Sequence, residues 1–582
     1  MSWKLILFAA LAGTNHVRSH APQWPFSGGP QYRFTPQRDQ PVPATAARLD
    51  NILPEIRDIL QTAGTAGISI GVLSHGKVLL DQHFGFADVE NQLVANSNTR
   101  YPLASITKSF IAAAIAQLVD EGRLRWEEPL STYVPELSFE SQPWLASNLF
   151  LTDLLAHKTG LIRLDALWLG ANGRVVIPKN FTIPVCNNLT SVYPFRTKWL
   201  YNNWMYALAG EIIERVTNQS LAEVLATRVF NSAGLSDTTL FPSEIPPDST
   251  ALPYMILADK TAVRVADTPL LDGELMASAG GIRSNVNDLL KWGDILLSTF
   301  RQDNDDPPRL KGLDMVLSGH SFINKKASTD ELYAFGLAKV TTPSQFGKIG
   351  FNVGLVDKMP MLGHLGPRET MFYHSGGLTG YNHCFMLVPG HQAVIVVLTN
   401  SIAHGDAADW VAQTLLQAVL GVKKPVDLRP YAGEAAESWK GIHQNMAKEL
   451  EKGRRTGTKE PSHAHLVGTY RHETGALHLQ VSKSEEDGTL RFNIDGPTDQ
   501  EHVLSHYHDD TFIFLPSSAD DRLSRGLFHY GTAAWLLHFT RSNITGEVDR
   551  IVWHLDDQDP AGQIFVKETS QSLAGAGGPT DL

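Results

Sequence analysis

The residues best suited to chemistry in this 582-residue chain are Ser105 and Lys108, three positions apart in an apolar segment. Residues at this spacing lie on the same side of a helix, so the hydroxyl and the amine can meet. Burial against Ile106, Phe110 and Ile111 would lower the pKa of the lysine, because an apolar environment disfavours the charged amine. A neutral amine can take the hydroxyl proton. The pair therefore predicts an activated serine nucleophile.

A second serine and lysine at the same spacing, Ser74 and Lys77, have a different setting. Apolar residues alternate on both sides of His75 and Gly76, which is typical of a β-hairpin turn. We therefore expect Ser74 and Lys77 to face solvent. Two residue types at a fixed offset recur by chance in a long chain, so further motifs must choose between the pairs.

Two such motifs follow the nucleophile. Tyr201, Asn202 and Asn203 open a predicted helix and form the only Y-x-N among fourteen tyrosines. A glycine-rich segment then precedes a strand-like apolar run, and it consists of His374, Ser375, Gly376 and Gly377.

In this order the motifs resemble those of the serine β-lactamase and penicillin-binding-protein superfamily, in particular its class C-like branch of esterases, D-aminopeptidases and acyltransferases. Residues 154–161 are similar to the LLxHxSGL segment of that branch, and residues 279–284 with Asp288 to its GG-x-x-S/T-x-x-D segment. The resemblance covers roughly residues 45–425. It implies an α/β fold with a β-lactamase-like antiparallel sheet, flanking helices and an all-helical lobe.

The resemblance also implies a role for each motif. Ser105 would be the nucleophile, and Lys108 and Tyr201 the proton-transfer groups, with either one as the acylation base. Asn203 would bond the substrate and the Lys108 amine, and the backbone N–H groups of Ser105 and Gly377 would hold the oxyanion. This chemistry needs no metal and no cofactor. The implied substrate-binding residues are Asn203, His374, Ser375, Gly376 and Gly377.

The third motif departs from the usual K-T-G of the superfamily, because His374 stands first. Histidine is largely uncharged at neutral pH, so the permanent cation that would hold a substrate carboxylate is lost. This favours ester, thioester or amide chemistry over efficient penicillin hydrolysis. A literal Lys158-Thr159-Gly160 precedes Tyr201, and we interpret it as the cap at a helix C-terminus.

Two other sequence patterns could indicate a functional site, but each has weaker support than the Ser105 motifs. The sequence around Ser69 spells G-x-S-x-G, the nucleophile motif of α/β-hydrolases, which requires a strand, a sharp turn and a helix. Here the apolar residues alternate onward as one strand, so we expect Ser69 to lie within a sheet. A histidine group that could suggest a metal site is interpreted as a polar turn; it comprises His502, His506 and His508, beside Asp509.

Composition and short motifs limit the binding partners and the cellular location that the sequence predicts. The chain has 49 Lys and Arg against 61 Asp and Glu, a net charge of -12 without a basic block, which argues against nucleic acid. Residues 1–21 contain a lysine and an apolar run too short to cross a bilayer, which is typical of a secretory signal peptide. We therefore expect a secreted protein without a transmembrane segment. Glycan acceptor sequons occur at Asn180, Asn188, Asn218 and Asn543.

The cysteine count excludes a scaffold built on disulfides, because the chain contains only Cys186 and Cys384. The sequence leaves open whether these two cysteines form a disulfide bond. Cys384 lies in an apolar run, which favours a buried thiol.

The length of the chain favours two domains. Beyond a charged linker, short strand candidates recur between turn residues, which predicts a small antiparallel β-barrel. It resembles the lipocalin-like C-terminal domain of some serine peptidases of this superfamily. We divide the chain into a signal peptide (1–21), a polar segment (22–44), a β-lactamase-like domain (45–426), a helix and linker (427–462), a lipocalin-like barrel (463–570) and a disordered tail (571–582).

These observations predict a secreted serine hydrolase that acts through an acyl-enzyme on Ser105 and cleaves an ester, thioester or amide bond in a small molecule or short peptide. An acyltransferase or an esterase that tailors a secondary metabolite would use the same scaffold. A non-catalytic penicillin-binding or sensor protein is the alternative of another class. The oligomeric state stays open.

Overall fold

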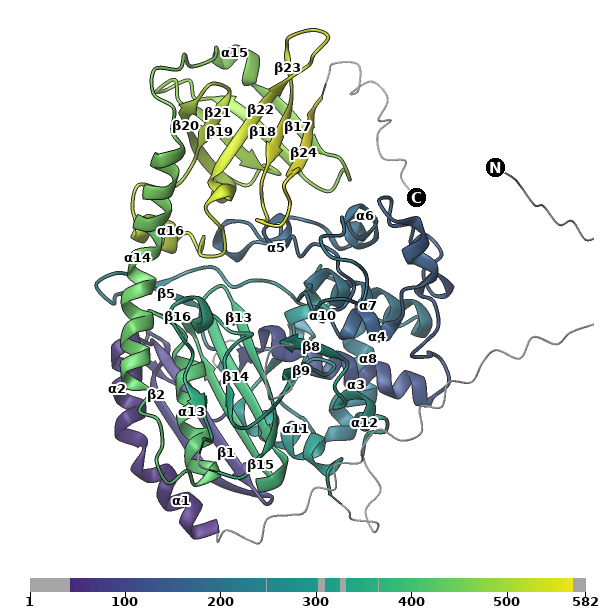
Figure 1. The fold of residues 1–582 in the computed structure, drawn as a ribbon, viewed down its shortest axis with the longest axis vertical. Helices are drawn as coiled ribbons and strands as arrows, with labels where there is room; N and C mark the ends of the chain where they lie inside the picture. Colours follow the sequence, from purple (N-terminus) through teal and green to yellow (C-terminus); the bar gives the residue numbers. More distant parts are fainter. Residues whose placement is uncertain (1–41, 247–248, 302–308, 325–330, 365, 569–582) are drawn as a thin grey trace, which may run out of the picture.

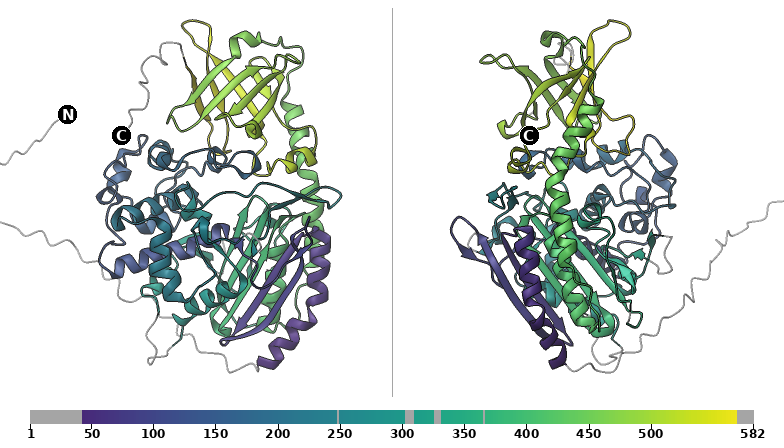
Figure 2. Two further views of the ribbon diagram at one scale, coloured as in Figure 1. Left: turned by 180° about the vertical axis from the view of Figure 1, so that it is seen from behind. Right: turned by 60° about the vertical axis from the view of Figure 1, so that its left-hand side comes forward.

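The computed structural model describes residues 42–568, except 247–248, 302–308, 325–330 and 365. The expected signal peptide and tail lie outside the described residues, as does nearly all of the polar segment. A large α/β part carries an all-helical lobe, and a β-barrel sits above both (Figure 1). The long helix α14 (Arg429–Gly453) runs from the large part to the barrel, as the two views of Figure 2 show.

The large part is built on a nine-stranded sheet, in which all the paired strands are antiparallel. The predicted fold class is therefore confirmed. Its strands, in spatial order, are β3 (Leu93–Val94), β2 (Lys77–Asp88), β1 (Gly67–Ser74), β15 (Ala393–Thr399), β14 (Tyr381–Val388), β13 (Thr370–Leu378), β10 (Ala338–Thr341), β9 (Glu331–Tyr333) and β8 (Ser321–Asn324).

Helices cover both faces of this sheet, which explains why β1, β14 and β15 are buried at every position. In β15, Val394, Val396 and Leu398 join the core on one face, and Ile395 and Val397 join the core on the other. The two faces are covered by α11 (Val286–Ser298) on one side and by α1 (Val42–Asn51), α2 (Leu53–Ala63) and α13 (Ala407–Leu420) on the other.

One half of β13 has no paired strand along one of its edges. Strand β10 pairs with β13 only from Thr370 to Tyr373. Beyond Tyr373, the stretch 374–378 is paired with β14 alone among the described strands. The glycine-rich motif thus lies on a strand segment with one free edge.

The hairpin expected near residue 75 is present, and one expectation about it is wrong. His75 and Gly76 form the turn between β1 and β2, both with positive φ. Lys77 is exposed as expected. Ser74, however, is buried and donates a hydrogen bond to the carbonyl of His391, because the turn before β15 covers the end of β1.

The helical lobe surrounds α3 (Thr107–Asp120), a helix buried on nearly all sides. The literal Lys158-Thr159-Gly160 begins in the C-terminal cap of α4, as expected: the Lys158 N–H donates to the Asp153 carbonyl at 3.1 Å, and the preceding His157 has the left-handed conformation, with a φ of 53°. The other helices of the lobe include α4 (Leu151–Leu155), α5 (Asp165–Trp168), α6 (Thr182–Asn188), α7 (Asn203–Thr217), α8 (Leu221–Leu225) and α10 (Ala277–Gly280).

The barrel is closed by eight antiparallel strands, and closure leaves no sheet edge. Aromatic side chains fill its interior, among them Phe492, Phe514, Trp535 and Trp553. The strands are β17 (Gly468–His472), β18 (His478–Lys483), β19 (Leu490–Ile494), β20 (Glu501–His508), β21 (Thr511–Ile513), β22 (Leu536–Arg541), β23 (Val548–Trp553) and β24 (Gln563–Lys567).

Several smaller expectations can be compared with this fold. His502, His506 and His508 lie on strand β20 and not in a turn, and His502 stacks on Phe492 inside the barrel. Among the described residues, no cluster of three or more His, Cys, Asp or Glu could hold a metal ion. Ser69 lies within β1, as expected.

Both cysteines are free and buried, so Cys186 and Cys384 do not pair. Within the part of the chain that the structure describes, each helix is too short or too polar to span a bilayer. The four sequons differ in accessibility: Asn180, Asn218 and Asn543 are exposed, whereas Asn188 is half-buried.

Candidate active site

Ser105 lies in a single 3₁₀ turn, η1 (Ala104–Ile106), directly before α3. The preceding residue, Ala104, has a φ of 48°, in the left-handed region that residues other than glycine rarely adopt. Backbone strain of this kind clusters at functional sites. Lys108, in the first turn of α3, donates a hydrogen bond of 3.1 Å from its Nζ to the Ser105 hydroxyl.

The Lys108 side chain is completely buried, and its Nζ also donates to the carbonyl of Ala279 at 2.8 Å. Burial lowers the pKa of Lys108 to about 7, and the negative charge of Asp165 offsets part of that fall. A substantial fraction of the amine is therefore neutral near pH 7. In that form Lys108 can accept the proton of Ser105.

Tyr201 lies just before α7, and its ring covers the lysine: the Lys108 Nζ is 5.0 Å from the ring centroid. The Tyr201 hydroxyl is buried without a hydrogen-bond partner among the described residues. Burial raises the pKa of Tyr201 far above its usual value, and the nearby Ser105 hydroxyl offsets only part of the rise. The phenol therefore stays protonated at neutral pH.

The glycine-rich motif brings His374 beside Tyr201, with 5.9 Å between the ring centroids. The His374 ring is buried between two partners: Nδ1 is 2.6 Å from the carbonyl oxygen of Ser375, and Nε2 is 2.9 Å from the Tyr333 hydroxyl. Burial lowers the pKa of His374 to about 3, and the charge of Lys108 contributes to the fall. His374 is thus neutral at pH 7 and supplies no cation.

Both glycines of the motif lie against neighbours that leave no room for a side chain. A Cβ on Gly376 would come within 2.5 Å of the carbonyl oxygen of Leu103. A Cβ on Gly377 would come within 2.4 Å of the Phe351 ring. The Phe351 ring therefore lies over the strand segment whose N–H was expected to hold an oxyanion.

Asn203 makes a contact different from the expected one. Its Nδ2 donates a hydrogen bond of 2.9 Å to the Asp165 carboxylate. The hydrogen bonds of Lys108 within the described residues go to Ser105 and Ala279 instead. The amide turns toward Asp165 because a carboxylate accepts from the amide N–H group more strongly than a neutral acceptor would.

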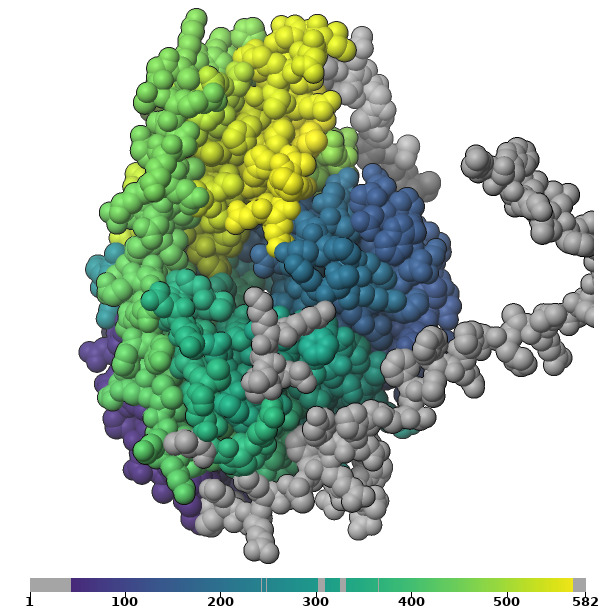
Figure 3. Space-filling model, in the orientation of Figure 1, coloured from purple at the N-terminus to yellow at the C-terminus, as the bar shows by residue number. Residues whose placement is uncertain are grey.

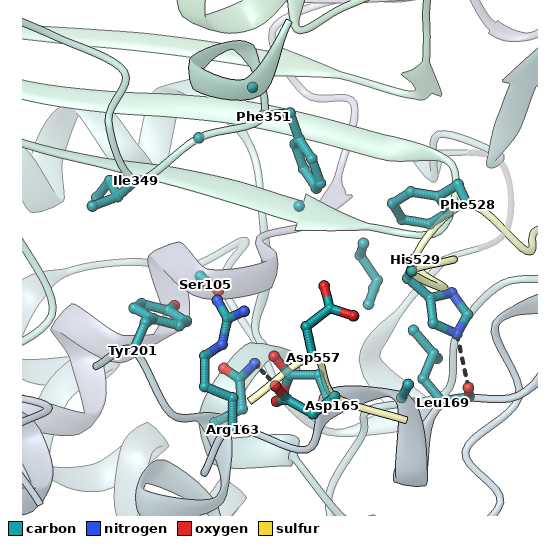
Figure 4. A pocket seen from close by; sticks show the side chains of 18 of the residues that line it. Ser105, Arg163, Asp165, Leu169, Tyr201, Ile349, Phe351, Phe528, His529 and Asp557 are labelled. Atoms are coloured by element: carbon teal, nitrogen blue, oxygen red, sulfur yellow. Dashed lines mark hydrogen bonds between the residues drawn. The ribbon is translucent and has the colours of Figure 1, made fainter. Parts of the chain in front are cut away.

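These residues open into a pocket of about 640 Å³ between the sheet, the helical lobe and the barrel. Figure 3 shows the surface hollowed where the barrel meets the other two parts. Figure 4 shows Ser105 and Tyr201 at one end of the pocket and Phe528 and His529 of the barrel at the other. The barrel side also contributes Gly531, Ala534, His554, Leu555, Asp556 and Asp557.

Side chains of the barrel domain hold residues 164–171, the segment that contains Asp165, by hydrogen bonds to its backbone. The Gln500 side chain accepts from the N–H of Ala171 and donates to its carbonyl, both at 2.9 Å. Asp556 accepts from the N–H of Leu164 at 3.1 Å, and His529 Nε2 lies 3.0 Å from the Leu169 carbonyl. One wall of the pocket thus depends on the second domain.

Family models match both parts of the chain. The model described as Beta-lactamase matches residues 54–418, more than half of the chain, and a domain of unknown function (DUF3471) matches residues 454–565. The chain belongs to the β-lactamase family. The predicted membership of the serine β-lactamase and penicillin-binding-protein superfamily is therefore confirmed.

Relatives of this β-lactamase-family chain are distant. The unguisins hydrolase of Aspergillus campestris is 25% identical over 236 residues, which are 40% of this chain and 44% of that protein. The match thus spans less than half of the length of the unguisins hydrolase. The D-aminopeptidase of Cereibacter sphaeroides is 23% identical over 408 residues, 69% of each protein. The octameric penicillin-binding protein homologue from Pyrococcus abyssi shares the fold, with a TM-score of 0.53 and 19% identity over 89% of this chain and 99% of that chain.

Three residues of the site were not predicted from the sequence. His157 lies in the LLxHxSGL-like segment, where it could have been noticed, and its Nδ1 accepts from the Asn202 N–H at 3.1 Å. It thereby fixes the backbone beside Tyr201. Asp165 and Tyr333 stand in no recognisable motif, and they reach the site only through the tertiary fold.

Proposed function

We propose that this β-lactamase-family protein is a serine hydrolase that cleaves an amide, ester or thioester bond through an acyl-enzyme on Ser105. The observation that carries the proposal is the hydrogen bond between Ser105 and a completely buried Lys108. A buried lysine beside a serine hydroxyl is the arrangement that general-base activation of the nucleophile requires. The unguisins hydrolase and the D-aminopeptidase among the relatives agree with a hydrolase.

Lys108 is the acylation base in this proposal. Its lowered pKa provides a neutral amine near pH 7, whereas burial keeps Tyr201 protonated. The neutral His374 provides no charge to stabilise a tyrosinate. Tyr201 instead donates a hydrogen bond, or passes the proton from Lys108 to the leaving group.

The reaction proceeds in two halves. The Ser105 oxygen attacks the carbonyl carbon while its proton moves to the Lys108 amine, and backbone N–H groups of Ser105 and Gly377 bind the oxyanion. The intermediate collapses, the leaving group takes the proton from Lys108 and departs, and the acyl group stays on Ser105. Water then attacks this ester with Lys108 again accepting the proton, which releases the acid and restores Ser105.

The pocket supports a small or short acyl substrate. Its volume of about 640 Å³ is within the usual range for small-molecule sites, and the barrel closes one side. The absence of a charged group at His374 favours a substrate that has no carboxylate at that position. Transfer of the acyl group to an alcohol or amine would use the same intermediate. We also propose that the protein is secreted, on the basis of the sequence of residues 1–21.

The test compares wild-type protein with Ser105→Ala on activated esters, D-aminopeptide amides and β-lactams. We expect turnover of at least one class by the wild type and none by Ser105→Ala, with unchanged thermal unfolding. Mass spectrometry after a fluorophosphonate should show one adduct, on Ser105. Retained activity in Ser105→Ala would remove this serine from the mechanism, and products formed with an added alcohol or amine would identify acyl transfer.

A further inference from the structure

The hydrogen bonds of His374 define which of its ring nitrogens carries the proton. The carbonyl oxygen of Ser375, 2.6 Å from Nδ1, can only accept, so Nδ1 must be protonated. A neutral imidazole has one N–H group, so Nε2 is an acceptor. The hydroxyl of Tyr333, 2.9 Å away, must then donate to Nε2.

We propose that Tyr333 is a positioning residue of this site, whose hydroxyl acts with the Ser375 carbonyl to hold His374 as the neutral Nδ1–H tautomer beside Lys108 and Tyr201. The inference rests on the proposed function for its catalytic consequence. The tautomer itself follows from the hydrogen bonds alone. Tyr333 comes from β9, which is not adjacent to β13 in the sheet, so its role could not be inferred from the spacing of the glycine-rich motif.

The surroundings of His374 contain positive and neutral groups. Burial and the charge of Lys108 both disfavour an imidazolium, and the carbonyl of Ser375 favours it only in part. Among the described residues, no carboxylate bonds to the ring. The titratable groups that face it are Lys108 from α3, His157 from the loop after α4, Tyr201 from the segment before α7 and Tyr333 from β9.

The fixed tautomer has two consequences for the reaction. A donor on Nε2 stabilises the neutral ring, so no second cation arises beside Lys108 to weaken its basicity. Rotation of the ring would also take the Nδ1–H group away from the Ser375 carbonyl in a buried site, and an unpaired buried N–H group is costly. Tyr333 would therefore maintain both the lysine base and the packing of His374 beside Tyr201.

The test measures the tautomer directly, by the ring-nitrogen chemical shifts of protein labelled with ¹⁵N-histidine. His374→Gln identifies the His374 signals. In the wild type we expect a protonated Nδ1 and an unprotonated Nε2 from pH 6 to pH 8. A wild-type ring protonated on Nε2 would overturn the proposal, whatever the activity of the enzyme.

Tyr333→Phe removes a single oxygen atom. We expect the Nε2 signal of its His374 ring to shift, because this acceptor loses its donor, while the Ser375 carbonyl keeps Nδ1 protonated. We expect kcat to fall about two- to tenfold, which is the value of one neutral hydrogen bond. The acid limb of its kcat/KM profile should stay in place, because burial and the charge of Lys108 keep the pKa of His374 low without Tyr333. Tyr373→Phe is the matched control: Tyr373 is also buried, on β13, but packs against Phe346.

The two readouts separate the possible failures. An unchanged Nε2 signal and an unchanged kcat in Tyr333→Phe would refute the role of Tyr333. A shifted Nε2 signal in Tyr333→Phe combined with full activity in Ser105→Ala would leave the positioning contact intact and refute the proposed function instead. Equal effects of Tyr373→Phe and Tyr333→Phe would reduce Tyr333 to a packing residue and overturn the proposal.

Discussion

The carboxylate of Asp165 accepts a hydrogen bond of 2.9 Å from the side-chain amide of Asn203. Because a carboxylate only accepts, the amide nitrogen must face Asp165 and the amide oxygen is left for another partner. The same carboxylate acts on Lys108, since its negative charge raises the pKa of the amine against the effect of burial. Asp165 thus links the orientation of Asn203 to the basicity of Lys108.

Replacing Asp165 by Asn should change both properties. Loss of the negative charge lowers the pKa of Lys108 further, so the acid limb of the kcat/KM profile should move to lower pH. Loss of the charged acceptor should reduce kcat/KM by roughly tenfold or more, the value of a hydrogen bond to a charged group. Asp557→Asn is the control, because Asp557 lines the same pocket without bonding to Asn203. An acid limb that stays in place would contradict the link to Lys108.

The pH dependence of the wild type should report Lys108. Its amine has a pKa lowered to about 7, so the neutral base form predominates above that pH and is lost below it. We therefore expect kcat/KM to rise with pH through a single limb near pH 7. No alkaline limb should come from Tyr201, whose pKa is raised by burial. A profile that is flat from pH 5 to pH 9 would exclude Lys108 as the base.

Lys108→Ala should reduce the acylation rate by about 10²–10⁴-fold, the usual contribution of a general base. Single-turnover kinetics with an activated ester measures this step. Lys77→Ala is the matched control, because Lys77 follows Ser74 at the same spacing as Lys108 follows Ser105 but is exposed in the hairpin. Equal losses in the two variants would show that the effect is not local to the site.

The core of the site could be predicted because short-range spacing determines it. Three residues along a helix bring Lys108 to Ser105 whatever the rest of the chain does. The orientation of Asn203 could not be predicted, because Asp165 lies 38 residues away in the chain and meets it only in the folded lobe. Tyr333 reaches His374 from a strand that is not its neighbour, which no local pattern encodes.

The sheet and the barrel were predictable for a similar reason, since alternation of apolar residues identifies strands. What covers a strand is a tertiary property. The hairpin turn at His75 and Gly76 predicts an exposed Ser74, yet the turn before β15 buries it. His502 was assigned to a polar turn because its neighbours are polar, but alternation places its side chain inside the barrel.

The barrel wall of the pocket should influence substrate binding. The rings of Phe528, from the barrel, and Phe351, from the loop over Gly377, lie with centroids 6.0 Å apart at the pocket (Figure 4). Phe528→Ala removes apolar contact area, so KM for a bulky apolar acyl substrate should rise by about tenfold or more, in line with the roughly 1.5–3 kcal/mol of a buried apolar side chain.

For a small activated ester, kcat should change little, because Ser105 and Lys108 are untouched. Ile544→Ala, at a barrel residue that is 95% exposed, provides the control. Equal KM values for Phe528→Ala and the wild type with the bulky substrate would show that the barrel does not contact it.

A buried pair of carboxyl groups should make stability depend on pH. Asp406 caps α13, and one of its oxygens accepts from the Asp409 N–H at 3.1 Å. Burial and the neighbouring Asp409 carboxylate raise the pKa of Asp406, and helix N–H groups offset only part of the rise. The folded protein therefore keeps a proton that the unfolded chain releases above about pH 4.

The free energy of unfolding from this group must fall as pH rises from about 4 toward the raised pKa, because the folded state binds more protons over that range. Asp406→Asn keeps the capping oxygen and removes the ionisation, so it should unfold at a higher temperature than the wild type at pH 8 and differ little at pH 5. Asp427→Asn is the control: Arg429 lowers the pKa of Asp427, so this change should give no gain at pH 8. Equal unfolding temperatures of Asp406→Asn and the wild type at pH 8 would show that ionisation of Asp406 does not destabilise the folded state.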